Sequence, residues 1–139
     1  MIGRLRKRLA GDRGSSLVEF AVTVFLLVMV ILAVVEFSRM VSIYTDLADA
    51  ARAGVRYAIV HGVDNAASDS AIEGVVASYA VGWLDTSQLA SNVTVSYPNG
   101  TKNVGDPVQV TVRYAYDPFS TYFPLSVTLS STSEGTIAF

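Results

Sequence analysis

The feature that most constrains this chain is an uncharged apolar run of sixteen residues, FAVTVFLLVMVILAVV, from Phe20 to Val35. With its apolar flanks, the run approaches the roughly 20 residues that span a bilayer core. A secretory signal peptide combines a short basic region with a small-residue cleavage site. Here the basic region is long, and the residues that end the run form a poor cleavage site. We therefore expect a retained transmembrane helix.

Helical character continues past the apolar run, because no proline occurs before Pro98. Beyond it, apolar residues recur at helical spacing along one face: Met40, Tyr44, Leu47, Ala48, Ala51, Val55, Ala58 and Ile59. On the opposite face, Asp49 and Arg52 are spaced for an i,i+3 ion pair. The pattern predicts one helix from about Ser15 to His61, of which only the first half can lie in lipid. Gly62-Val63-Asp64-Asn65 is expected to end it.

The charges are distributed unevenly along the chain. Residues 1–14 hold five bases and one acid, whereas residues 15–139 hold five bases and eleven acids. A basic leader before an apolar helix predicts a cytoplasmic N-terminus. The acidic remainder offers no basic stripe, which argues against nucleic acid as a partner. The absence of cysteine excludes disulfides and thiolate metal sites.

The rest of the chain predicts a small α+β domain over residues 63–139. A helix begins near Asp69, with Ser68 or Asp69 as its cap, and apolar residues at helical spacing extend it to Trp83. Period-two alternation predicts strands over 93–97 and 108–116, and a last strand over about 125–138, in which Ser133-Glu134-Gly135 is a candidate break. Short connections favour an antiparallel meander, and one sheet face needs the long helix as its cover.

The chain lacks the residue clusters of an enzyme, and we expect no catalytic residue, cofactor or metal. His61, the single histidine, is expected to interact with the last carbonyls of the long helix. The aromatic residues near the end of the second strand have two interpretations. A contact loop for a partner would use Tyr116, Phe119, Tyr122 and Phe123. Core packing at the sheet edge is the interpretation that the sequence favours.

Glu19 is a carboxylate near the start of the membrane helix, and a charge at the centre of such a helix costs roughly 2.5–3.5 kcal/mol on insertion scales. It either reaches the head groups or has a partner. If the chain is cleaved after Gly14, Ser15 gains an α-amino group with a pKa of about 7.7–8.0. Glu19 of one copy can then face Ser15 of another. Such a buried pair fixes the register between packed helices more reliably than it adds stability. Glu19 and its neighbour Phe20 are therefore candidate assembly residues.

Four segments, taken in order, resemble the TadE-like pseudopilins of the tight-adherence (Tad/Flp) branch of type IV pili. They are RGSSLVEFA at 13–21, VEFSR at 35–39, AARAGVRYA at 50–58 and VQVTVRYAYDPF at 108–119, and Phe123-Pro124 also fits. The junction of glycine, four residues, then Glu-Phe is moderately specific by itself. The resemblance covers nearly the whole chain.

The resemblance implies that a prepilin peptidase removes leader 1–14 between Gly14 and Ser15. The mature protein would hold residues 15–37 in the cytoplasmic membrane, continue the helix over 38–62 and place the C-terminal domain outside. It would act with a pilus assembly platform and other pilins as a minor pilin or pseudopilin, and would be extracellular once a pilus is assembled.

Two other functions stay open from the sequence. A principal subunit of a helical filament, a homo-oligomer, would use the long helix in a central bundle. The small residues Ala48, Ala51 and Gly54, with Val55, would then permit close helix packing. A membrane-anchored binding module would instead use the aromatic loop 116–123 as its contact surface, and Glu19 would be incidental.

Overall fold

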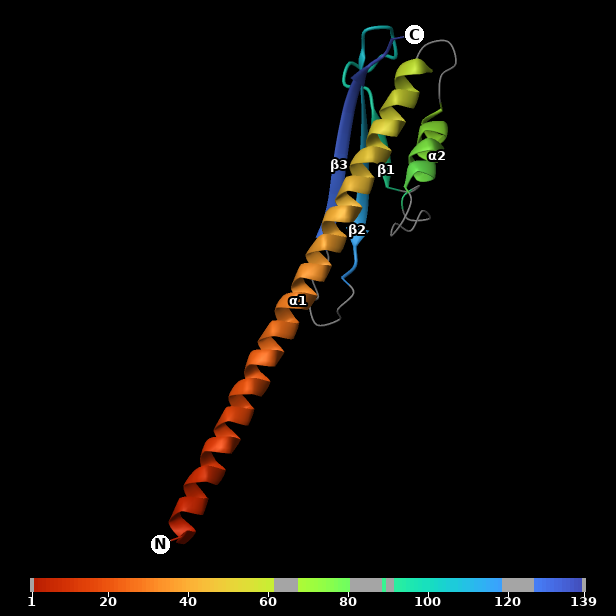
Figure 1. Ribbon diagram of the computed structural model, residues 1–139. Coiled ribbons are helices and arrows are strands. Elements are labelled where there is room, and N and C mark those ends of the chain that lie inside the picture. Colours follow the sequence, from red (N-terminus) through yellow and green to blue (C-terminus); the bar gives the residue numbers. More distant parts are fainter. Residues whose placement is uncertain (1, 62–67, 81–88, 90–91, 119–126, 139) are drawn as a thin grey trace. The chain divides into compact units, whose positions relative to one another are not determined.

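The structure is a computed structural model that describes residues 2–61, 68–80, 89, 92–118 and 127–138, with side chains from residue 14 onward. Its contacts divide the chain into two compact units, Met1–Ser38 and Arg39–Phe139. The first unit is entirely helical where it is described. The second unit holds the rest of that helix, a second helix and a sheet (Figure 1). The predicted α+β class is confirmed.

Helix α1 runs without interruption over Ile2–Val60, so it begins earlier than the sequence predicted. At its other end, the His61 backbone N–H donates to Tyr57 O at 3.2 Å. The imidazole Nδ1 lies 2.9 Å from the same carbonyl oxygen. The expected interaction of His61 with the final carbonyls is therefore confirmed, because its backbone N–H and its imidazole both contact the Tyr57 carbonyl oxygen. The predicted stop at 62–65 lies outside the described residues.

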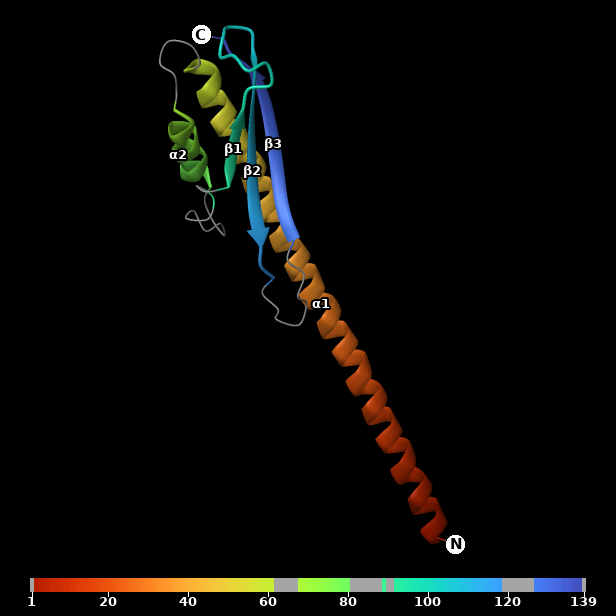
Figure 2. The ribbon, with the colours of Figure 1, turned by 180° about the vertical axis from the view of Figure 1, so that it is seen from behind.

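Three antiparallel strands form the sheet in the order β1-β2-β3. Their bounds are Val93–Ser96 for β1, Pro107–Tyr116 for β2 and Val127–Thr136 for β3. The predicted meander is confirmed. Side chains also join the strands on the outer face, where Gln109 Nε2 donates to Glu134 Oε2 at 2.8 Å. The part of α1 that belongs to the second unit covers the other face (Figure 2).

Strand β3 is continuous through the candidate break, so that expectation was wrong. Ser133, Glu134 and Gly135 pair in register with Val110, Gln109 and Val108. Gly135 has a packing role: a Cβ there would lie 2.5 Å from Ile59 Cδ1 and 2.7 Å from Val55 Cγ1. The residue that suggested a turn is therefore the one that lets α1 approach the sheet.

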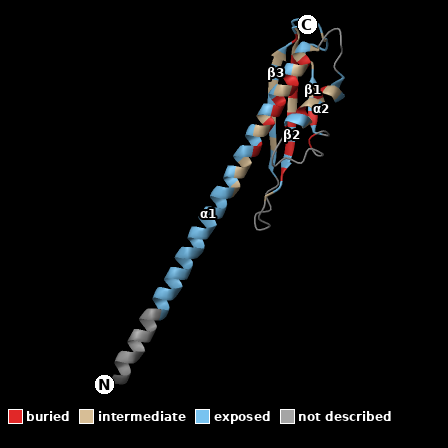
Figure 3. Ribbon diagram, turned by 45° about the vertical axis from the view of Figure 1, so that its right-hand side comes forward, coloured by how far each residue is buried: buried red, intermediate tan, exposed pale blue. Residues whose placement is uncertain are grey.

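The core lies between α1, α2 and β2, and Figure 3 shows its buried residues on these elements. In β2, the predicted alternation is confirmed, because Val108, Val110 and Val112 are fully buried. In α1, the predicted face is wrong at one position: Tyr44 is 51% exposed, while Ile43 is fully buried. The buried stripe passes through Ile43 and Leu47, and one residue along a helix turns a side chain by about 100°.

Helix α2 spans Asp69–Tyr79 and buries Ile72 and Val76. Ser68 occupies the predicted N-cap position, but neither candidate side chain caps the helix. Instead, Ser68 Oγ lies 2.8 Å from Ser70 Oγ, and Asp69 forms an ion pair with Lys102 at 3.6 Å. Trp83, which the sequence assigned to this helix, lies outside the described residues.

The connection between β1 and β2 is organised around Asp106. Gly100 and Gly105 have positive φ angles of 71° and 93°, as turn glycines do. The Asp106 carboxylate accepts hydrogen bonds from Thr101 Oγ1 at 2.6 Å, Asn99 Nδ2 at 3.1 Å and Asn103 N at 3.0 Å. These bonds, the one from Thr101 first, lower the pKa of Asp106 below its ordinary value.

We predict that Asp106→Asn makes the protein less sensitive to acid. Because the pKa of Asp106 is lower in the folded state, its stabilising contribution is present above the ordinary aspartate pKa of about 3.9. It is lost as the pH falls through the lowered folded-state value. Thermal unfolding midpoints of wild type and variant, measured from pH 6 down to 2, should therefore converge at low pH. Two curves that stay parallel throughout would contradict this role.

Candidate functional site

The N-terminal unit is an exposed apolar helix. From Gly14 to Val35 every side chain is exposed, and this part of α1 is long and apolar enough to cross a membrane. None of the most apolar window is buried against the rest of the chain. Thr23, a polar residue in the run, donates its hydroxyl to Glu19 O at 2.9 Å, so its hydrogen bond is made within the helix. An apolar surface this continuous indicates a membrane anchor.

Gly14 has no packing role in the fold. A Cβ at this position would meet nothing within 4 Å, whereas at Gly54 it would lie 2.6 Å from Val76 Cγ2. Glycine inside a helix costs about 1 kcal/mol relative to alanine. The fold of the described residues therefore favours another residue at position 14, and the reason for glycine lies outside that fold.

Ser15, Glu19 and Phe20 are all exposed, with Phe20 at 67%. Ser15 and Glu19 are four residues apart in α1 and so share one helix face. The Glu19 carboxylate consequently projects from an apolar helix surface, where a charge is costly in lipid. Its expected contact with Ser15 of another copy stays a prediction.

The four small-residue candidates lie mostly inside the second unit. Ala51, Gly54 and Val55 are buried, and Ala48 is half-buried. At Gly54 a Cβ would lie 2.6 Å from α2 and 3.2 Å from Val110 of β2. The small side chains thus let α2 and β2 approach α1, where the sequence had suggested contacts between helices of an assembly.

Some of the aromatic candidates lie in the core, and the others lie outside the described residues. Tyr114 and Tyr116 are 8% and 4% exposed, so both pack in the core, as the favoured interpretation held. The guanidinium carbon of Arg39 lies 5.4 Å from the centroid of the Tyr116 ring, in range for a cation–π contact. Phe119, Tyr122 and Phe123 lie outside the described residues.

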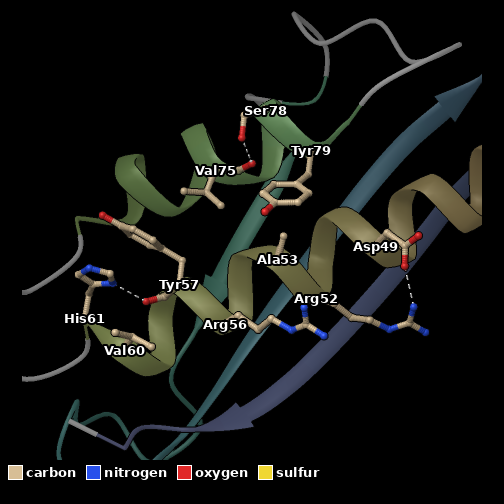
Figure 4. A pocket seen from close by; sticks show the side chains of 10 residues that line it. All are labelled: Asp49, Arg52, Ala53, Arg56, Tyr57, Val60, His61, Val75, Ser78 and Tyr79. Atoms are coloured by element: carbon tan, nitrogen blue, oxygen red, sulfur yellow. Dashed lines mark hydrogen bonds and ion pairs between the residues drawn. The ribbon is translucent and has the colours of Figure 1, made fainter.

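An open groove of about 680 Å³ runs between α1 and α2 in the second unit (Figure 4). Its lining consists of Asp49, Arg52, Ala53, Arg56, Tyr57, Val60 and His61 from α1 and Val75, Ser78 and Tyr79 from α2. The predicted Asp49–Arg52 ion pair is confirmed at 2.8 Å. The Tyr57 and His61 rings stack with centroids 4.2 Å apart. Sequence reasoning missed the groove because it depends on where α2 packs.

These features define a membrane-anchored protein of the α+β class. Residues 14–56 match the model of the TadE-like protein family. The match begins at the junction glycine, lies wholly within α1 and confirms the predicted resemblance over this segment. Searches of curated proteins and of solved structures return no match.

The TadE-like family consists of pilin-like, structural components associated with the Tad pilus, and it is not an enzyme family. In the described part of the chain, no group of three or more His, Cys, Asp or Glu side chains could hold a metal ion. Residues 14–56 are thus similar to a family of Tad pilus-associated proteins, and the exposed apolar helix suggests a membrane anchor.

Proposed function

We propose that this chain is a minor pilin or pseudopilin that a prepilin peptidase cleaves between Gly14 and Ser15 before it takes part in assembling a Tad-type pilus. The observation that carries the proposal is Gly14. It is an exposed helical glycine without a packing role, it begins the family-matched segment, and it directly precedes the exposed apolar helix. A peptidase that needs close access to the backbone would account for a glycine there.

The charge order supports an orientation for this process. The basic leader 1–14 would stay in the cytoplasm with the peptidase, residues 15–37 would lie in the membrane and the domain would lie outside. Cleavage would also change the environment of Glu19. It would create a positive α-amino group on the same helix face, so neighbouring copies or other pilins could offset the cost of the carboxylate in lipid.

A principal-subunit role is a second candidate, favoured by the unbroken exposure of the helix from Gly14 to Val35. Such a surface could pack against copies on every side. The share of this chain in sheared surface fibres separates the two candidates: a trace amount supports the minor role, and the bulk of the fibre supports the principal role.

Glu19→Ala tests the assembly role. We expect normal membrane insertion and normal leader removal, but at least a tenfold loss of the chain from sheared fibres, since a difference of only 1.4 kcal/mol is already tenfold in an equilibrium. Thr23→Ala, one turn further along the helix, is the matched control and should assemble normally. Wild-type levels of Glu19→Ala in fibres would show that the carboxylate is incidental, as in a plain binding module.

A further inference from the structure

The groove between α1 and α2 carries positive charge in an otherwise acidic part of the chain. Residues 15–139 hold five bases against eleven acids, and two of those five bases, Arg52 and Arg56, stand on one wall of this groove. Arg52 is engaged by Asp49. Arg56 is exposed, and no ion pair joins it to another of the described residues. The opposite wall presents Tyr79, which is 60% exposed. The groove therefore fits a partner that carries a carboxylate.

The outward face of α2 has the complementary chemistry. On this face Ser70 and Gly74 are exposed, Glu73 and Ala77 are half-buried, and none of the four lines the groove. Three of the four are small, and they recur at helical spacing around Glu73. Gly74 weakens the helix relative to alanine, yet a Cβ there would meet nothing within 4 Å. Close approach of a neighbouring molecule would explain a glycine at this position.

We propose that the groove of one copy receives α2 of a second copy, with Glu73 of the second copy beside Arg56 of the first. The small residues on the same face let the α2 backbone approach the groove, because the distance between packed helices is set by the side chains at the contact. The Glu73 carboxylate supplies a counter-charge for Arg56, whereas Arg52 already has one in Asp49 of the same wall.

This contact uses different surfaces on the two copies, so it is heterologous and can repeat. If successive copies repeat this contact in one direction, all of them can have the same orientation in the membrane. The inference rests on the proposed function, because it requires copies of this chain to meet during pilus assembly, and it applies equally to the principal-subunit candidate. It adds to the helix contact at Glu19 a second contact within the domain.

The absence of cysteine in the chain allows a direct test. Two differently tagged full-length copies, Gly74→Cys and Ala53→Cys, are co-expressed and oxidised in native membranes. Ala53 lines the groove (Figure 4), so we expect a mixed dimer that neither copy forms alone. Thr94→Cys, exposed on β1, replaces Gly74→Cys in the control and should give none. No mixed dimer, or a dimer of Gly74→Cys with itself, would overturn the contact.

Charge reversal sharpens the test. In the same cross-linking pair, Arg56→Glu on the Ala53→Cys copy should lower the yield of mixed dimer at least tenfold. Glu73→Arg on the Gly74→Cys copy should then restore it. Arg113→Glu, an exposed position on β2, is the control and should leave the yield unchanged. A loss without rescue, or no loss, would contradict the pairing of Glu73 with Arg56.

The N-terminus of each cross-linked sample separates this inference from the proposed function. A chain that begins at Ser15 and enters fibres without the mixed dimer overturns the contact alone. A mixed dimer formed by a chain that keeps its leader supports the contact and overturns the proposed processing.

Discussion

A Gly14→Val variant is expected to keep its leader, with the cleaved fraction at least tenfold below wild type. Valine should fold normally here, since a Cβ at Gly14 meets nothing within 4 Å and the position is helical. The branched side chain would, however, block the backbone from close contact with a peptidase. Intact mass spectrometry of the protein from native membranes measures the fraction directly.

Gly11→Val is the matched control, because it places the same side chain in the same leader without touching the junction. It should be processed like wild type. Normal cleavage of Gly14→Val would contradict the assignment of this glycine, and equal loss in both variants would point to a general effect on the leader.

Gly54→Val is expected to destabilise the second unit by about 3 kcal/mol or more, the upper part of the range for overpacked cores. Even a Cβ alone would lie 2.6 Å from Val76 Cγ2 and 3.2 Å from Val110 Cγ1, and valine adds two further methyl groups. For a domain of about 100 residues, this corresponds to a fall in the unfolding midpoint of roughly 12–24 °C. Thermal unfolding in detergent, followed by near-ultraviolet circular dichroism, measures it.

Gly74→Val provides the control for the backbone effect of replacing a helical glycine. Gly74 lies in α2 with open space where its Cβ would be, so valine there should leave the midpoint within a few degrees of wild type. Similar large losses in both variants would contradict the assignment of the Gly54→Val loss to the contact among α1, α2 and β2, because valine has a higher helix propensity than glycine.

The sequence predicted those elements whose pattern is local. Strand β2 alternates apolar and polar residues over its whole length, and its alternation matches the burial of Val108, Val110 and Val112. Strand β3 was harder, because Ser131, Ser133 and Gly135 face the core side beside α1 and look like turn residues. Their small size is explained only once the helix is in place, and a single sequence does not show that packing.

In the candidate site, too, some residues could be predicted from the sequence and others could not. Gly14 and Glu19 are close in one helix, so their spacing could be recognised from the sequence alone. The groove could not, because Arg56 and Tyr79 come from different helices and meet only after α2 has packed on α1. Likewise, Gly54 suggested a helix contact, but only the structure shows that the contact is with α2 and β2 of the same chain.

The most direct test of the proposed processing is the N-terminal residue of the wild-type protein recovered from membranes and sheared fibres. Edman degradation or top-down mass spectrometry distinguishes a chain that starts at Ser15 from one that retains residues 1–14. We predict that the fibre-associated protein begins with Ser15, with Glu19 as its fifth residue. A fibre-associated chain that still begins at Met1, or that is cut at another position, would contradict the assignment of Gly14 and the role proposed for Glu19.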